Sequence, residues 1–421
     1  MRSIKLAAFV AVAAAIAGLG PVAAPAGAQT TASADQIKRG EYLARAGDCV
    51  SCHTQPGGGA PYAGGMTMKT PYGDLITPNI TPDPQTGIGR WSSEDFYRAL
   101  HDGVGKNVGD LYPAMPYTFY TRVTREDSDA IFAFLQSVPP VRNVVYADLL
   151  RWPFDIRMSM AFWRELYFTE GTFQPDPARS PEWNRGAYLV EGLGHCSACH
   201  SPRNRLGAIE QDRAFTGATV DGWFALNLTS ELKTGLGSWS VDQIATYLKT
   251  GASKRKSTTL GDMAEVVHNS LSYLTDADLR AMATYLKSIP ADTSNAGGGP
   301  VARVPRKAAK LYLDNCGACH QAKGRGVPGT FPPLAGNGVV LAPDPADILM
   351  VVLKGVPSRN GYMAMPSFAG RLTDEQIADI ANYVRGSWGN GAAANVTPRM
   401  VEGLRRQLSR NADAARVARL R

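Results

Sequence analysis

All six cysteines of the chain occur in pairs separated by two residues, and a histidine follows each pair. The three motifs are Cys49-Val50-Ser51-Cys52-His53, Cys196-Ser197-Ala198-Cys199-His200 and Cys316-Gly317-Ala318-Cys319-His320. Two thiols three positions apart lie on one face of a helical turn, where they can form thioethers to the two vinyl groups of one haem. The adjacent imidazole can then bind the iron. The spacing therefore predicts three covalently attached c-type haems.

Other uses of paired cysteines fit this chain less well. A lone C-x-x-C is typical of a redox-active disulfide or of half a zinc site, and six cysteines in an exported chain could form three disulfides. Here every cysteine belongs to a motif, and three of the six histidines follow one. We expect His101 and His195, which lie outside the motifs, to make ordinary surface or supporting hydrogen bonds.

The far side of each haem needs a second axial ligand, and methionine is the first candidate because it raises the potential. The first and third motifs are followed by Tyr112-Pro113-Ala114-Met115-Pro116 and Tyr362-Met363-Ala364-Met365-Pro366. In both, the proline after Ala-Met holds the loop extended. Met115 and Met365 are therefore the expected ligands, and Met363 is the rival of Met365.

The second motif has no Met-Pro sequence after it. Met263 follows Cys196 at nearly the same spacing as Met115 follows Cys49, so it is the expected second-haem ligand. His268 is the alternative, and a haem bound by two histidines would have a lower potential.

Similar sequence surrounds each motif, which predicts three units of one fold. Arg39-Gly40-Glu41-Tyr42-Leu43 and Arg185-Gly186-Ala187-Tyr188-Leu189 indicate matching helices before the first two motifs. We expect each unit to close with a helix that begins at Thr124, Thr275 or Thr373, because apolar residues follow at helical spacing. Repeats of about 100 residues indicate a mostly α-helical chain of three tandem haem domains.

The expected boundaries follow from these repeats and from composition. Residues 1–28 have a basic start, an apolar run and a small-residue cleavage site, the pattern of an export signal. The predicted segments are a signal peptide at 1–28, domain one at 34–140, a linker with an aromatic helix at 141–180, domain two at 181–290, a flexible linker at 291–305, domain three at 306–390 and a basic tail at 391–421.

The net charge of +7 is concentrated at the two ends of the chain. Residues 399–421 hold seven arginines against Glu402 and Asp413, and the signal holds two cations, so the body is near neutral. A nucleic-acid-binding protein would carry basic charge on its folded domains, so we expect no nucleic-acid partner. The tail has apolar residues at helical spacing, which fits either docking on a membrane or partner, or a solvated tail.

Several stretches around the motifs resemble the tri-haem cytochrome c subunits of bacterial membrane-bound dehydrogenases, which oxidise alcohols, gluconate, sorbitol, fructose or aldehydes. These stretches are Arg39–Cys49, Thr77–Asp83, Tyr112–Pro116 and Asn184–Cys196. The resemblance runs from about residue 36 to about residue 390. It implies a periplasmic subunit attached peripherally to the outer face of the inner membrane.

The resemblance also implies how the chain works. A separate catalytic dehydrogenase subunit would oxidise the substrate, and electrons would pass through three covalent haems c to ubiquinone. The chain itself would then be a non-catalytic electron-transfer subunit. Two alternatives stay open: a catalytic multihaem enzyme such as a peroxidase, which needs an open iron, and a free electron shuttle without a dedicated partner.

Overall fold

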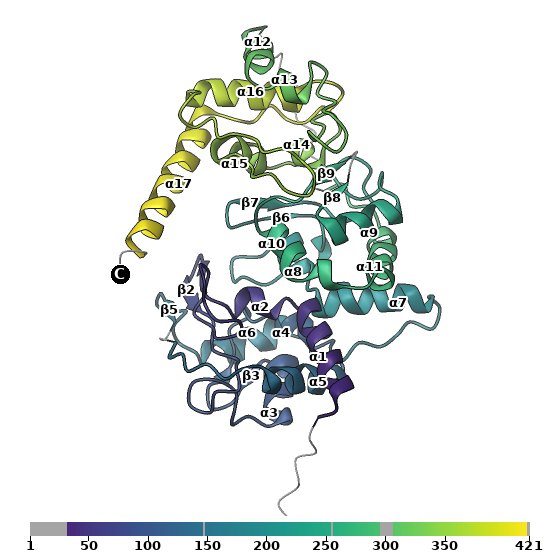
Figure 1. The fold of residues 1–421 in the computed structure, drawn as a ribbon, viewed down its shortest axis with the longest axis vertical. Coiled ribbons are helices and arrows are strands. Elements are labelled where there is room, and N and C mark those ends of the chain that lie inside the picture. Colours follow the sequence, from purple (N-terminus) through teal and green to yellow (C-terminus); the bar gives the residue numbers. More distant parts are fainter. Residues whose placement is uncertain (1–31, 146–147, 254–255, 295–305, 419–421) are drawn as a thin grey trace, which may run out of the picture.

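The computed structural model describes residues 32–145, 148–253, 256–294 and 306–418. Helices dominate these ranges and the strands are short, which confirms the predicted mostly α-helical class. The expected signal peptide and most of the expected linker at 291–305 lie outside the described residues. Three groups of elements follow one another along the long axis, and we call them the first, second and third units (Figure 1). Within the described ranges, no helix is both long and apolar enough to cross a membrane.

The elements of the three units are as follows. The first unit and the segment after it contain α1 (Ala34–Ala46), α2 (Cys49–Cys52), β1 (Thr67–Thr70), β2 (Gly73–Ile76), α3 (Ser93–Tyr97), η1 (Arg98–Asp102), β3 (Val104–Gly105), β4 (Gly109–Asp110), α4 (Tyr117–Tyr120), α5 (Arg125–Ser137), β5 (Leu149–Leu150) and α6 (Ser159–Tyr167). The second contains α7 (Pro181–Tyr188), η2 (Leu189–Leu193), α8 (Ser197–His200), η3 (Gln211–Arg213), β6 (Ala218–Val220), β7 (Trp223–Ala225), α9 (Val241–Thr250), β8 (Ala252–Ser253), β9 (Ser257–Thr258), α10 (Gly261–Asn269), η4 (Leu271–Tyr273) and α11 (Asp276–Ser288). The third contains α12 (Arg306–Asn315), α13 (Gly317–His320), α14 (Gly338–Leu341), α15 (Ala346–Lys354), α16 (Asp374–Gly386) and α17 (Pro398–Ala418).

The closing helices α5, α11 and α16 begin where the sequence predicts. The side chains of Thr124, Thr275 and Thr373 each accept a hydrogen bond from the backbone N–H three residues later, at 3.2 Å. At Thr373 the Gln376 side chain bonds back to the threonine N–H, which completes a capping box.

In the first two units the opening helix crosses the closing helix at a glycine. α1 packs against α5, and α7 packs against α11. A Cβ added at Gly40 would overlap the carbonyl oxygen of Ala130, and one added at Gly186 would overlap that of Ala281. The recurring Arg-Gly sequence is therefore explained by the close approach of two backbones, which only glycine permits.

The first and second units pack together through a reciprocal pair of hydrogen bonds. Tyr42 of the first unit donates its hydroxyl to Asp278 Oδ2 of the second, at 2.6 Å. Tyr188 of the second donates to Asp127 Oδ2 of the first, also at 2.6 Å. One hydrophobic core runs through both units, so they stabilise each other. Arginines of the same motifs pair with these carboxylates: Arg39 with Asp127 and Arg185 with Asp278.

The third unit has a separate core, which the basic tail completes. Val401 at the start of α17 is fully buried, and Leu404 and Leu408 pack against the same cluster as Ile377 of α16. Arg405 Nε donates to Asp374 Oδ1 at 2.9 Å. This part of the tail's apolar face therefore covers the protein's own core and is not free for a membrane or partner.

The segment predicted as a linker at 141–180 packs on the first unit. Strand β5 pairs antiparallel with β2, which in turn pairs with β1, so the three form one small sheet. The Asn79 side chain donates to the carbonyl of Val141 at 2.7 Å. Three other sheets in the described part of the chain are two-stranded antiparallel pairs: β3 with β4, β6 with β7 and β8 with β9.

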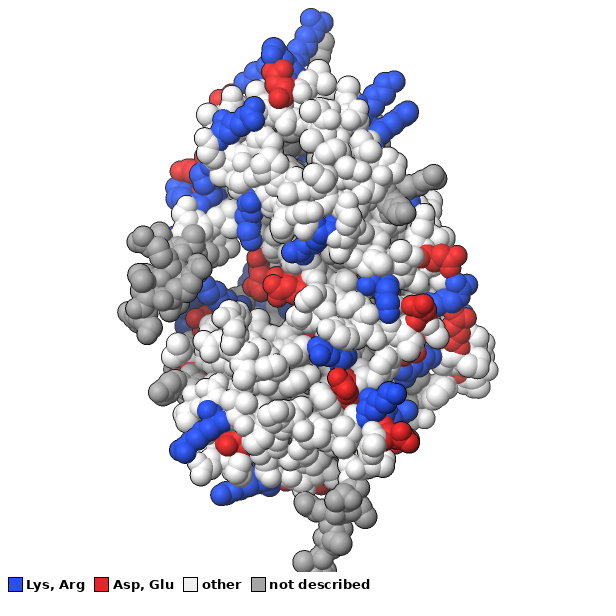
Figure 2. All heavy atoms as spheres, in the orientation of Figure 1, with Lys and Arg blue, Asp and Glu red and all other residues white. Residues whose placement is uncertain are grey.

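Charged side chains on the surface are of mixed sign. Figure 2 shows lysines and arginines interspersed with acidic residues on the viewed face, with wide uncharged areas between them. No continuous basic band crosses the described part of this face, which fits the near-neutral body inferred from the sequence.

The third unit contacts the second through a buried carboxyl. The backbone N–H of Phe224, in β7, donates to Asp347 Oδ1 of α15 at 2.7 Å. Asp347 is only 4% exposed. Burial raises its pKa to about 7; the Phe224 N–H opposes this shift and the nearby Asp344 charge adds to it.

This raised pKa predicts a pH-dependent stability. The folded state binds more protons than the unfolded chain between pH 3.8 and about 7, so the free energy of unfolding should fall across that interval as the pH rises. Asp347→Asn keeps an acceptor for Phe224 and cannot ionise. We expect it to be about 2 kcal/mol more stable than the wild type at pH 8 and nearly equal at pH 4. Chemical denaturation at both pH values measures this, and a pH-independent difference would contradict it.

Candidate functional site

Each C-x-x-C-H motif forms a single helical turn, at α2, α8 and α13. In each turn the histidine N–H donates to the carbonyl of the first cysteine, at 2.9 to 3.0 Å. This i to i+4 bond places the histidine above the first cysteine on one face of the turn. The turns therefore have the local geometry in which two thiols and one imidazole can reach a single ligand.

The three motif histidines share one hydrogen-bonding arrangement. Nδ1 of each ring donates to a backbone carbonyl, at distances of 2.6 to 3.0 Å. This bond fixes the tautomer and the ring orientation, and it leaves Nε2 free to bind a metal. The histidine–carbonyl pairs are His53 with Pro78, His200 with Leu226 and His320 with Pro332.

Sequence reasoning missed these carbonyl partners, although the first two carry a signal. Pro78 and Leu226 are each followed by an Asn-x-Thr sequence. The Asn79 side chain accepts from the Thr81 N–H at 2.9 Å, and the Asn227 side chain accepts from the Thr229 N–H at 2.8 Å. Each asparagine thus braces the loop that presents the carbonyl.

Five of the six motif thiols lie in surroundings that disfavour their ionised form. Burial raises the pKa of Cys49 and Cys196 to about 12 and that of Cys52 and Cys316 to about 11. A redox-active or zinc-binding cysteine acts as a thiolate, which this environment opposes. All six cysteines lie in the described part of the chain, and none forms a disulfide.

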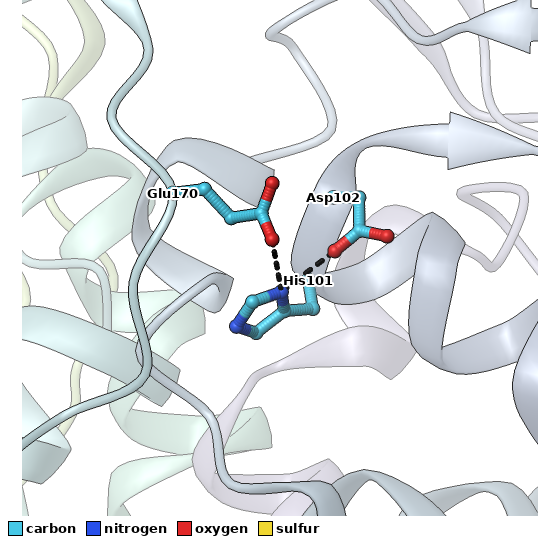
Figure 3. A group of neighbouring side chains, drawn as sticks. All are labelled: His101, Asp102 and Glu170. Carbon is cyan, nitrogen blue, oxygen red and sulfur yellow. Dashed lines mark hydrogen bonds and ion pairs between the residues drawn. The ribbon is translucent and has the colours of Figure 1, made fainter.

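One other group of side chains converges within the described residues. His101, Asp102 and Glu170 are close enough to hold a metal ion (Figure 3). His101 Nδ1 lies 2.7 Å from Asp102 Oδ1 and 3.9 Å from Glu170 Oε1, while its Nε2 lies 3.1 Å from Thr172 Oγ1. Both ring nitrogens have protein partners. The group therefore ties the segment around residue 170 to η1, the supporting role expected for His101.

An apolar cavity lies beside the third motif. Cys316, His320 and Met365 line it together, so the predicted imidazole and thioether ligands face one space. Met363 also lines the cavity, but it is 59% exposed. Met365 is half-buried, and its backbone exchanges two hydrogen bonds with Val356, at 2.8 and 2.9 Å. The structure thus holds Met365 more firmly than its rival.

One wall of this cavity comes from the second unit. Ser257, Thr258 and Leu260 line it, and they directly precede α10. The third site is therefore complete only when the second and third units are packed together.

The candidate ligands of the second site lie on one helix. Met263 and His268 both belong to α10 and are five residues apart, so they point about 140° apart around the helix. Met263 is half-buried and packs against the core shared by the first two units, whereas His268 is exposed. Met263 is thus the one that faces the protein interior.

Met115 lies between two apolar clusters. It packs against the shared core and against a smaller cluster that includes Met160 and Trp163 of α6. Helix α6 therefore supports the Met115 loop with its inner face. Two large apolar side chains of α6, Phe162 and Leu166, are exposed on its other side, and Trp152, which precedes the helix, is 79% exposed.

Comparison with known proteins adds to this geometry. A family model described as Cytochrome c matches residues 37–139 and 305–388, which hold the first and third motifs. The chain is 41% identical to the gluconate 2-dehydrogenase cytochrome c subunit of Pantoea cypripedii, over 92% of this chain and 93% of the relative. It is 41% identical to the cytochrome c subunit of alcohol dehydrogenase (quinone) from Gluconobacter oxydans, over 92% and 86%. It is 38% identical to the fructose dehydrogenase cytochrome subunit of Gluconobacter japonicus, over 86% and 82%.

Proposed function

Because the chain belongs to the family of cytochrome c subunits of dehydrogenases, its cofactor is covalently bound haem c, and we propose that it carries three haems and passes electrons from a dehydrogenase subunit to the respiratory chain. One observation carries the haem count: the C-x-x-C-H turn with its histidine Nδ1 held by a carbonyl occurs three times. The third occurrence faces a cavity with apolar walls, which suits a porphyrin. The chain itself is then not the catalyst.

Each proposed site gives its residues separate tasks. When bound, haem c supplies reversible one-electron oxidation and reduction. The cysteine pairs would hold the ring covalently, and a histidine Nε2 and a methionine thioether would bind the iron, where the thioether would raise the potential. The proposed pairs of iron ligands are His53 with Met115, His200 with Met263 and His320 with Met365.

We propose that the three sites belong to three tandem domains, at 34–140, 181–290 and 306–390. Each range holds one C-x-x-C-H turn between an opening helix and a closing helix, which supports this division. The reciprocal contacts between the first two units and the shared cavity wall between the last two keep neighbouring units packed together.

The proposed donor is a catalytic dehydrogenase subunit, and the proposed acceptor is ubiquinone. The relatives' names support the first, and the word quinone in one of them supports the second. The export-signal pattern at 1–28 supports a periplasmic location, attached peripherally to the outer face of the inner membrane. The exposed apolar face of α6 is the surface that we assign to the dehydrogenase, because its inner face backs onto the Met115 loop.

The test is to purify the chain with and without the proposed dehydrogenase subunit and to follow haem absorbance after adding gluconate, an alcohol or fructose. We expect the haems to be reduced only when the dehydrogenase is present. Reduction by substrate without the partner would overturn the proposal, as would a stable, active complex whose haems stay oxidised.

A pair of matched variants tests the docking surface. Phe162 and Leu232 are both 69% exposed, and only Phe162 lies on α6. Phe162→Glu should weaken the complex about tenfold or more, because interface cores do not tolerate an unpaired charge. Leu232→Glu should have little effect. Equal effects of the two variants would show that α6 is not the docking surface.

A further inference from the structure

The residue before the first cysteine has a left-handed backbone in the first two motifs. Asp48 has φ of 50° and His195 has φ of 35°, whereas the corresponding Asn315 lies within helix α12. A positive φ is uncommon for residues other than glycine, and it persists where the surrounding structure imposes it. Both left-handed residues lie where the first and second units meet, so contacts between the units are the candidate cause.

We call the first and second C-x-x-C-H turns the two attachment turns. They are joined by a junction of three residues, Gly47, Tyr120 and His195. The Tyr120 hydroxyl donates to the Gly47 carbonyl at 2.8 Å, two residues before Cys49. The Tyr120 ring packs edge-on against the His195 ring, with centroids 5.6 Å apart and planes at 72°. Burial lowers the pKa of His195, while hydrogen bonding to its own backbone and to the Gly47 carbonyl acts in the opposite direction. The first unit therefore contacts the second next to Cys196.

Gly47 also lies within ordinary van der Waals range of the second unit. A Cβ added at Gly47 would lie 3.5 Å from both Cys49 Sγ and Leu193 Cδ2. Leu193 is the last residue of η2 and lies three residues before Cys196. Tyr120 is the last residue of α4, which begins two residues after Met115. One side chain thus connects the Met115 loop, the first attachment turn and the second attachment turn.

A second contact braces the other side of the same interface. The Asn269 side chain, at the end of α10, donates to Ser51 Oγ at 2.9 Å, and Ser51 Oγ donates to Asp48 Oδ1 at 2.6 Å. Helix α10 also carries Met263. Each of the two left-handed residues is therefore linked by side chains to the opposite unit.

We propose that Tyr120 and His195 are positioning residues that hold the second haem-attachment turn against the first and so set the rate of electron exchange between these two haems. The inference rests on the proposed function only in requiring that both haems are bound. Electron tunnelling falls steeply with distance, so a small displacement of one turn has a large effect on the rate.

The experiment uses the isolated, full-length haem-bearing cytochrome, partly reduced by a chemical reductant. Exchange between haems is measured by two-dimensional exchange NMR, and the separation of the two oxidised irons by pulsed EPR. His195→Gly removes the ring and adopts the left-handed backbone freely, and His195→Asn keeps a hydrogen-bonding group that tolerates this backbone. Tyr120→Phe removes only the hydroxyl. Tyr42→Phe is the matched control, because it removes a hydroxyl contact across the same interface away from both attachment turns.

We expect His195→Gly to slow exchange about tenfold and to broaden the iron–iron distance distribution, since small displacements of paired groups carry large rate penalties. The exchange rate of His195→Asn should lie between those of the wild type and His195→Gly. Tyr120→Phe should slow exchange measurably, and the exchange rate of Tyr42→Phe should stay within about twofold of the wild-type rate. The proposal is overturned if the exchange rate and the iron–iron distance are unchanged in His195→Gly. It is also overturned if Tyr42→Phe slows exchange as much as His195→Gly does. If His195→Gly does not mature, Tyr120→Phe decides by the same criteria. Because no dehydrogenase is present, failure here is distinct from failure of the proposed function.

Discussion

Alanine in place of both Cys316 and Cys319 is expected to give a protein that matures with two covalent haems and keeps its first two units folded. The third unit has its own core, whereas a single core runs through the first and second. Loss of the thioether links leaves the third cavity without a covalently held ring, so the damage should stay in that unit. Mass spectrometry of the denatured protein measures the loss of one haem, and haem-linked absorbance reports the state of the remaining two.

The same double substitution in either of the other motifs should be more harmful. Removing the ring from the first or the second unit exposes the core that both units share, so the yield of haem-bearing protein should fall several-fold. Gly317→Ala is the control within the third motif, because its Cβ would meet Leu313 only at 3.4 Å. It should keep all three haems. Equal losses of yield at the three motifs would contradict the separation into a shared and an independent core.

The features that the sequence predicts correctly depend on short-range patterns. The caps at Thr124, Thr275 and Thr373 require only a hydroxyl and the N–H three residues later, so they can be inferred from a few letters. The helical motif turns and the mostly α-helical class follow from spacing in the same way. These predictions need no knowledge of what the helices pack against.

The features that the sequence does not predict depend on partners far along the chain. The hydrogen bonds from Tyr42 to Asp278 and from Tyr188 to Asp127 cross between units, and nothing in a local pattern selects those partners. The packing of the basic tail is a second feature that depends on partners far along the chain. Its apolar spacing predicts an amphipathic helix, but only the fold shows that Val401 and Leu404 cover the core around Ile377. Periodicity indicates which face is apolar, not what covers it.

Single substitutions decide whether Met263 or His268 binds the second iron. Met263→Ala should leave the second iron without its thioether, so that carbon monoxide binds to the native reduced protein. His268→Ala should change nothing, because His268 is exposed on a different side of α10 from Met263. Met263→His should lower the potential of one haem by on the order of 100 mV, since axial ligands tune haem potentials over roughly 0.8 V.

The control for these variants is the third site, where the same test can be made on two methionines. Met365→Ala should open the iron to carbon monoxide and Met363→Ala should not, because Met365 is held by its backbone bonds to Val356 and Met363 is exposed. Carbon monoxide binding to His268→Ala but not to Met263→Ala would make His268 the ligand and reverse the assignment. That result would also require α10 to turn by about 140°, which would pull Met263 away from the shared core. A ligand role for His268 is therefore incompatible with the observed packing of Met263 against the shared core.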